Sequence, residues 1–222
     1  MIEHLNEKCK EYYQPAAELS IDERMVRSKA RFSFKQYIRN KPTKWGFKLW
    51  CLCDAVTAYT SKFVVYRGKT GEIRTANGLG YDVVFDLTRH YMDQGYRLYV
   101  DNFYTGPTLA LDLYSRSTHL TGTLKTGRVG VPQEVKDQFQ KLSRTSTPRG
   151  TGVYVRDGNL RYSIWKDMKC IVVMSSQHPG HSESRVVRNW MKTATDKGGT
   201  ANSSSTTTNI CMEQIDLINK VL

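Results

Sequence analysis

The sequence predicts one α/β domain, a mixed β-sheet with helices on both faces. Strand-like apolar runs alternate with segments whose apolar residues recur at helical spacing. Residues 97–125 have the order strand, helix, strand, which requires parallel pairing by a right-handed crossover. A chain of 222 residues, 39% of them hydrophobic, is long enough for one large domain, or for one domain with an insertion.

Apolar spacing, together with glycine and proline positions, predicts the elements of the first half. In chain order these are a short amphipathic helix within residues 1–18 that ends before Pro15, a strand that ends at Asp22, a hairpin of residues 46–53 and 62–66, a loop at 68–80, a helix at 81–95, a strand at 97–100, a helix from Gly106 through Tyr114, and a strand at 119–125. The loop is marked by its four glycines.

An inserted α+β segment, about residues 127–207, is expected before a final helix. Its elements are a helix at 131–142, a hairpin of 153–155 and 160–165, and a buried strand at 170–174. Residues 193–208 are polar and low in complexity, which predicts a flexible loop. Residues 1–19 are therefore expected to lead into a domain of residues 20–222.

Three separate segments each deliver a carboxylate. An apolar run ends at Asp22 and another ends at Asp101, as expected where a buried strand reaches the edge of a sheet. Near the C-terminus Ile215, Ile218 and Leu222 fall at helical spacing, which turns Asp216 toward the same core side. In a chain otherwise rich in Lys and Arg, three such acids imply a site that holds divalent cations against phosphate.

The net charge of +12 is concentrated in residues 24–48, which contain nine basic residues and no acid. Aromatic residues interleave with them, a mixture that suits a phosphate backbone and base stacking. A solvated basic face is the alternative interpretation. The residues expected to contact nucleic acid are Arg31, Lys35, Tyr37, Arg39, Lys41, Lys44, Trp45 and Lys48, with Lys125 from a later strand.

Composition excludes several classes of protein. There is no apolar run of 18 residues, so no membrane span is expected, and the polar N-terminus does not resemble a signal peptide. The five cysteines have no paired CxxC spacing and are expected to be reduced thiols, with a zinc site as the weaker alternative. His178 and His181 form a second, weaker candidate metal pair in a loop.

Several of these segments closely resemble the piggyBac transposase family. The matching residues are 20–23, 34–48, 100–105, 122–125 and 165–167. The resemblance implies an RNase H-like domain whose three carboxylates bind two Mg²⁺ or Mn²⁺ ions. It also implies a nuclear protein whose partner is DNA, which excises DNA elements through hairpin ends and integrates them at TTAA. Full-length members tend to act as homodimers.

By position, the resemblance assigns Asp22, Asp101 and Asp216 as both catalytic residues and metal ligands. Around the third acid, Glu213 and Gln214 replace two glycines of the family pattern, and Asn219 replaces a further Asp. Family members also extend beyond both ends of this segment. The chain is therefore expected to be an incomplete or decayed copy, inactive alone. The alternative is a domesticated relative that binds DNA or protein without cutting.

Overall fold

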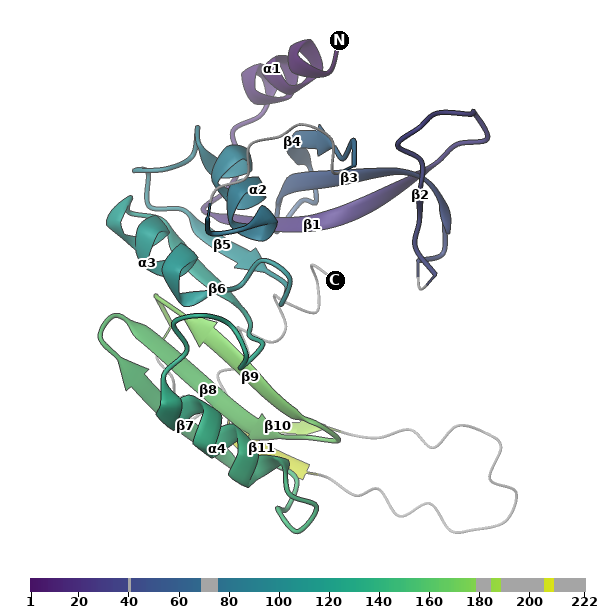
Figure 1. Cartoon of the computed structure of the whole chain (residues 1–222). Coiled ribbons are helices and arrows are strands. Elements are labelled where there is room, and N and C mark those ends of the chain that lie inside the picture. Colours follow the sequence, from purple (N-terminus) through teal and green to yellow (C-terminus); the bar gives the residue numbers. More distant parts are fainter. Residues whose placement is uncertain (40, 69–75, 179–184, 189–205, 210–222) are drawn as a thin grey trace.

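The computed structural model describes residues 1–39, 41–68, 76–178, 185–188 and 206–209. Within them nine strands form one sheet in the order β2-β3-β1-β5-β6-β9-β8-β7, and β4 also pairs with β3 (Figure 1). The strands of this sheet are β1 (Glu18–Arg27), β2 (Gln36–Tyr37), β3 (Trp45–Asp54), β4 (Thr60–Val65), β5 (Arg97–Val100), β6 (His119–Thr123), β7 (Gly152–Asp157), β8 (Leu160–Lys166) and β9 (Cys170–Ser175). The expected α/β fold with a mixed sheet is confirmed.

Strands β1, β5 and β6 form the parallel centre of the sheet, and the other strands pair antiparallel. The crossover expected within residues 97–125 is β5, α3 (Pro107–Ser115) and β6. The described part of the expected insertion is α4 (Gln133–Ser143) followed by β7, β8 and β9. These three strands continue the same sheet, because β9 pairs with β6.

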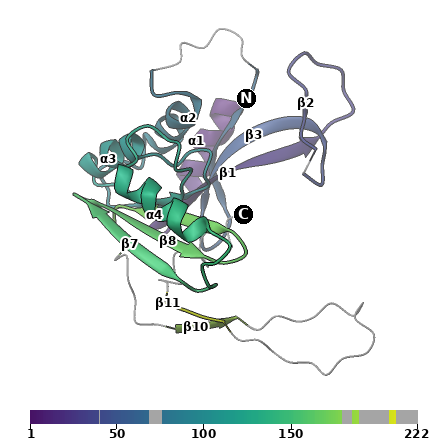
Figure 2. The ribbon, with the colours of Figure 1, turned by 60° about the horizontal axis from the view of Figure 1, so that its bottom comes forward.

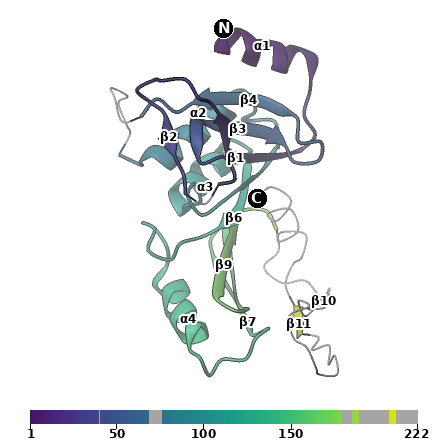
Figure 3. The ribbon, with the colours of Figure 1, turned by 90° about the vertical axis from the view of Figure 1, so that its right-hand side faces the viewer.

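Helices were expected on both faces of the sheet, but among the described helices α2 (Leu79–Thr88), α3 and α4 all pack on the same face (Figure 3). The core lies between them and the sheet. It includes Ile21, Leu98 and Leu120 from the three parallel strands, together with Ala110 and Leu113 of α3, all of which are buried. Burial of these apolar side chains is the main driving force for this packing. Because side chains alternate along a strand, the residues that flank Ile21 and Leu98 point to the opposite face.

Helix α1 (Ile2–Tyr12) lies along β4, at the edge of the sheet. The side-chain amide of Asn6 donates to the carbonyl oxygen of Phe63 (2.9 Å), and its oxygen accepts the Phe63 N–H (3.0 Å). An edge strand otherwise leaves such groups free to pair with another chain. The N-terminal helix therefore protects this edge. None of the described helices has the length and hydrophobicity that a membrane span requires.

The apolar pattern indicated that the first strand ends at Asp22, but in the structure the strand continues beyond this residue. β1 continues to Arg27, because β3 pairs with it from Leu19 to Arg27. Backbone hydrogen bonds of this ladder hold polar residues as well as apolar ones. The parallel pairing with β5 does end one residue earlier, at Ile21.

Two other boundaries differ from expectation. The helix expected at 81–95 is α2, which ends at Thr88; Asp93 and Gly95 beyond it adopt φ angles of +63° and +77°, which a right-handed helix does not contain. In the expected polar loop, β11 (Thr206–Asn209) forms a strand that pairs with β10 (Arg185–Arg188). Some of the residues singled out in the sequence lie outside the described ranges. They are His181, Asp216, and Glu213, Gln214 and Asn219, which differ from the family pattern.

Candidate active site and nucleic-acid interface

Asp22 and Asp101 occupy equivalent positions on neighbouring strands. The parallel ladder of β1 and β5 ends with the pair Ile21 and Val100, and each Asp is the next residue of its chain segment. Neighbouring strands lie about 4.8 Å apart, so the two acids lie side by side just beyond the end of this parallel ladder. Because Ile21 points into the core, Asp22 points to the opposite face.

Asp22 lines a pocket of about 360 Å³, here called the acidic pocket, together with Cys51, its cross-strand neighbour on β3. Burial raises the pKa of Asp22, and the negative charge of Asp101 adds to this effect. The ammonium group of Lys41 acts in the opposite direction, with its nitrogen 3.9 Å from the Asp22 carboxylate. The half-buried Asp22 therefore lies among charges of both signs.

Asp101 also organises the turn that follows β5. Its carboxylate accepts the backbone N–H of Phe103 (2.8 Å), and its carbonyl oxygen accepts the N–H (3.1 Å) and hydroxyl (2.8 Å) of Thr105. Close packing against β6 fixes the turn: a Cβ on Gly122 would lie 2.3 Å from the Thr105 hydroxyl and 2.4 Å from the carbonyl oxygen of Val100. Only glycine fits at this position.

Arg128 is a residue of this site that no sequence pattern predicted. Its guanidinium donates to the carbonyl oxygens of Asn102 (3.1 Å) and Phe103. These hydrogen bonds stabilise the turn that follows Asp101. Asn102 itself is exposed, and α3 has Gly106 as its N-cap without a side-chain cap, so Asn102 does not cap that helix. No local pattern marks Arg128, because the contact joins segments distant in sequence.

Tyr104 is a second residue of this site that no sequence pattern predicted. It is buried, and its hydroxyl has no hydrogen-bond partner among the described residues. Burial raises its pKa, and the charges of Glu23, Asp101 and Asp22 raise it further. Buried hydroxyl groups normally have a hydrogen-bond partner. Because the Tyr104 hydroxyl has none among the described residues, a further polar group is expected to pair with it at this site.

Lys48 of β3 contacts residues of β1 and of the turn after Asp101. Its ammonium nitrogen lies 2.5 Å from the Glu23 carboxylate and 5.7–5.9 Å from the ring centres of Trp50, Tyr66 and Phe103. Cations are attracted to such ring faces, and the effect grows with burial. Lys48 was expected to contact nucleic acid, but the structure places it inside this aromatic cage, where it ties β1 and β3 to the turn after Asp101.

Residues 24–48, here called the basic arm, extend from the sheet on the side away from α3 (Figure 1 and Figure 2). The arm comprises the end of β1, the loops around β2 and the beginning of β3. A Cβ on Gly46 would lie 2.0 Å from the carbonyl oxygen of Val26, so glycine permits the close pairing of β1 and β3 here. Phe32 stacks on Phe47 with ring centres 4.0 Å apart, which gives the arm a small core of its own.

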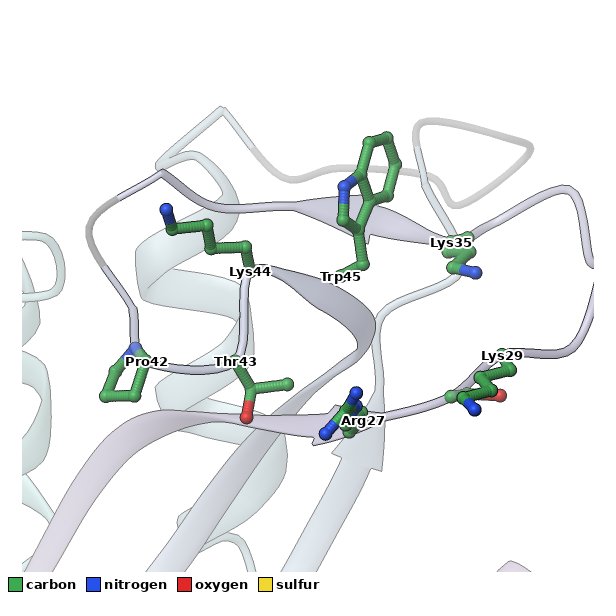
Figure 4. A pocket seen from close by; sticks show the side chains of 8 residues that line it. Arg27, Lys29, Lys35, Pro42, Thr43, Lys44 and Trp45 are labelled. Carbon is green, nitrogen blue, oxygen red and sulfur yellow. The ribbon is translucent and has the colours of Figure 1, made fainter.

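The arm forms a pocket of about 730 Å³, here called the basic pocket (Figure 4). In Figure 4, Lys44 and Trp45 stand along its upper side, and Arg27 and Lys29 along its lower side. The residues that line it are Arg27, Ser28, Lys29, Lys35, Pro42, Thr43, Lys44 and Trp45. Pro42 and Thr43 also line the acidic pocket, so one turn of the arm separates the two pockets.

The remaining residues expected at the interface are distributed around these pockets. Arg31, Tyr37 and Arg39 are exposed on the arm, whereas Lys41 lies against Asp22. Lys125 is exposed and follows β6 at the edge of the sheet where Asp101 follows β5.

The weaker metal candidates find little support in the described part of the chain. Cys51 and Cys53 share a face of β3, and burial raises the pKa of the Cys51 thiol to about 12, which keeps it protonated. His178 is buried, with its ring nitrogen 3.2 Å from the hydroxyl of Tyr99. Among the described residues, no three His, Cys, Asp or Glu side chains lie close enough to hold a metal ion.

Comparison with known proteins agrees with this architecture. Residues 1–209 match the family described as Transposase IS4. The human PiggyBac transposable element-derived protein 3 is 31% identical over 183 residues, which are 79% of this chain and 30% of that protein. The human Chimeric ERCC6-PGBD3 protein matches at 31% identity over 79% of this chain and 17% of its own length.

A solved structure matches as well, that of a piggyBac transposase synaptic complex with hairpin DNA. It aligns with a TM-score of 0.72 and 27% identity over 82% of this chain and 37% of that one. The fold, the paired acids and these matches define an RNase H-like domain of the transposase class, a class that uses divalent metal ions. The chain belongs to the piggyBac transposase family. It spans about 30% of the length of its human relative.

Proposed function

We propose that this chain carries the catalytic core of a piggyBac-type transposase, which cleaves DNA phosphodiester bonds and rejoins strands at TTAA. The observation that carries the proposal is the position of Asp22 and Asp101, each one residue beyond the last pair of a parallel ladder. This position brings two acids from distant segments of the chain to the same end of two neighbouring strands. Asp216 is the proposed third acid.

The donor chemistry of the site fits Mg²⁺ or Mn²⁺, because both ions prefer carboxylate oxygens. Mutual repulsion of Asp22 and Asp101 favours a bound cation, and the pKa of Asp22 is raised mainly by burial and further by this repulsion. Two bound metal ions supply an activated water and stabilise the leaving oxygen of a phosphodiester. The chain's own residues set the geometry: Arg128 and Gly122 hold the Asp101 turn, and Asp216 is proposed to complete the ligand set.

The basic arm is the proposed DNA-binding surface. Its cations include Arg31, Lys35, Arg39 and Lys44. The similar piggyBac transposase forms a synaptic complex with hairpin DNA. Phosphate contacts by Lys and Arg release counterions and give affinity without sequence specificity. By resemblance to its family, the protein is proposed to act in the nucleus and as a homodimer.

Metal binding tests the proposed site directly. Mn²⁺ is titrated into the full chain and into Asp22→Asn, Asp101→Asn and Asp216→Asn, with free Mn²⁺ measured by electron paramagnetic resonance. Each substitution is expected to weaken binding, whereas the matched control Asp93→Asn, an exposed Asp paired with Arg116, should leave it unchanged. Mn²⁺ binding that is unaltered in Asp22→Asn and Asp101→Asn would refute the assignment.

Cleavage of transposon-end DNA flanked by TTAA tests the reaction. No nicking is expected from the unmodified chain, because larger side chains replace the family glycines at Glu213 and Gln214 and an uncharged Asn219 replaces an Asp. Cleavage is expected only after Glu213→Gly, Gln214→Gly and Asn219→Asp are combined. Metal-dependent nicking by the unmodified chain, abolished by Asp101→Ala, would show that these departures are tolerated.

A second candidate function is a domesticated DNA-binding protein that does not cut. The observation that favours it is the match to a human protein named as transposable element-derived, together with the three substitutions around Asp216. Assays of DNA binding and of metal-dependent cleavage distinguish the two functions. A non-cutting relative binds DNA through its basic arm with no metal-dependent nicking, even after Glu213, Gln214 and Asn219 have been restored to the family residues.

A further inference from the structure

We propose that the basic pocket binds one unpaired nucleotide of DNA, with its phosphate among the pocket's cations and its base against Trp45. The proposal rests on the proposed function, because it specifies the form of DNA that the basic arm recognises. The pocket has a volume of about 730 Å³, within the range of small-molecule sites and large enough for a nucleotide.

The charge of the pocket suits a phosphate. Four of its lining side chains are cationic, and residues 24–48 contain no acid. In the described part of the chain none of these four forms an ion pair, so their charges are available to an external anion. The four residues are Arg27, Lys29, Lys35 and Lys44.

The aromatic side chains of the arm fall into two groups. Phe32 and Phe47 are half-buried and stack on each other, so they serve the packing of the arm. Trp45 and Tyr37 are 55% and 51% exposed, with ring centres 4.8 Å apart. The exposed face of Trp45 is therefore available for a base to stack on. The ammonium of Lys35 lies 6.0 Å from the Trp45 ring, which brings a phosphate-binding group beside a stacking surface.

The combination of cations and an exposed aromatic ring in the basic pocket favours binding of an unpaired nucleotide over binding of a duplex. In a duplex the base faces are stacked on one another, and a side-chain ring reaches them only when a base leaves the stack. Phosphates of a duplex need no pocket, since exposed lysines on a flat surface contact them. Pro42 and Thr43 line both pockets, so a nucleotide bound here lies next to the acidic pocket. This places unpaired DNA close to Asp22, one of the two paired acids of the proposed cleavage site.

Fluorescence anisotropy of the full chain with two labelled probes tests the proposal: a short oligothymidylate and a blunt duplex. Trp45→Ala is expected to weaken oligothymidylate binding about tenfold, the scale of one lost base–aromatic stack, and duplex binding less than about twofold. Lys44→Ala should weaken both, because it removes a phosphate contact. Trp45→Phe, which keeps a ring, should restore most of the single-strand affinity.

Tyr12→Ala is the matched control, since Tyr12 is also an exposed ring with a lysine, Lys8, 5.7 Å from its centre, but it lies on α1. It should change neither affinity. Equal losses for both probes in Trp45→Ala, or no loss, would overturn the nucleotide pocket while leaving salt-dependent DNA binding by the arm intact. If the unmodified chain binds neither probe, the pocket and the proposed DNA-binding function are both wrong.

Discussion

The ammonium nitrogen of Lys41 lies 3.9 Å from a carboxylate oxygen of Asp22, and it also donates to the carbonyl oxygen of Glu23 (3.4 Å). Lys41 belongs to the turn of the basic arm that separates the two pockets. The arm therefore places a positive charge beside one of the two paired acids. This charge offsets part of the repulsion between Asp22 and Asp101 when no metal ion is bound.

We predict that Lys41→Met raises the affinity of the chain for Mn²⁺ by about five- to tenfold, because a fixed positive charge near the ligands repels the incoming cation. The measurement is a Mn²⁺ titration followed by electron paramagnetic resonance. Lys44→Met is the control, since Lys44 lies in the same turn region but lines only the basic pocket. An unchanged or lower affinity in Lys41→Met would contradict the prediction.

Removing cations from the arm should flatten the salt dependence of duplex binding. Replacement of Lys35, Arg39, Lys41 and Lys44 by Ala is expected to reduce the slope of log K against log salt by up to about 3.6, because each lost phosphate contact removes about 0.9 of slope. The control replaces four exposed cations of α4 and the segment that follows it as far as β7, which are Lys141, Arg144, Arg149 and Arg156. An equal change in both variants would remove the arm from the interface.

Gly122→Ala should destabilise the fold, because its Cβ would lie 2.3 Å from the hydroxyl of Thr105 and 2.4 Å from a backbone oxygen. Overpacking of this kind costs about 1–3 kcal/mol or more. Urea unfolding followed by circular dichroism measures the loss. Gly127→Ala is the matched control, since a Cβ there has nothing within 4 Å, and it should change the stability by less than about 0.5 kcal/mol. Equal midpoints for the two variants would rule out this packing.

Asp54 is a buried carboxylate that ties α1 to the β3–β4 connection. Burial alone would raise its pKa, but it accepts hydrogen bonds from the N–H groups of Ala16, Val56 and Thr57 and from the hydroxyl of Tyr13, which lower the pKa to about 2. Asp54→Ala leaves these buried donors without an acceptor. It should lower the free energy of unfolding by about 2–4 kcal/mol at neutral pH.

The pH dependence of this contribution follows from the depressed pKa. The charged carboxylate stabilises the fold, so the contribution is fully present above the ordinary pKa of 3.8 and is lost as the pH falls toward 2. Urea unfolding of the unmodified chain and of Asp54→Ala should therefore converge at low pH. Asp93→Ala, which removes an exposed acid, should cause a much smaller loss. A constant difference between the unmodified chain and Asp54→Ala from pH 7 to pH 2 would contradict this account.

Local patterns in the sequence were sufficient for most elements of the fold. The hairpin of β7 and β8 follows from two strand-like runs around Asp157 and Gly158, and Gly158 adopts the φ of +56° that a tight turn needs. The order of strand, helix and strand required the parallel pairing of β5 and β6. These features depend on neighbours in sequence, so periodicity and turn residues predict them.

What the sequence by itself determined about this protein is the α/β class, the order of its elements, the concentration of charge in the arm and the two acids that follow apolar runs. Only the tertiary structure decided that β1 continues past Asp22, that Lys41 lies against that acid, and that Lys48 enters an aromatic cage instead of facing solvent. The physical reason is distance along the chain. Long-range contacts such as that of Arg128 with Phe103 arise from packing of whole strands and helices, and no local spacing encodes them.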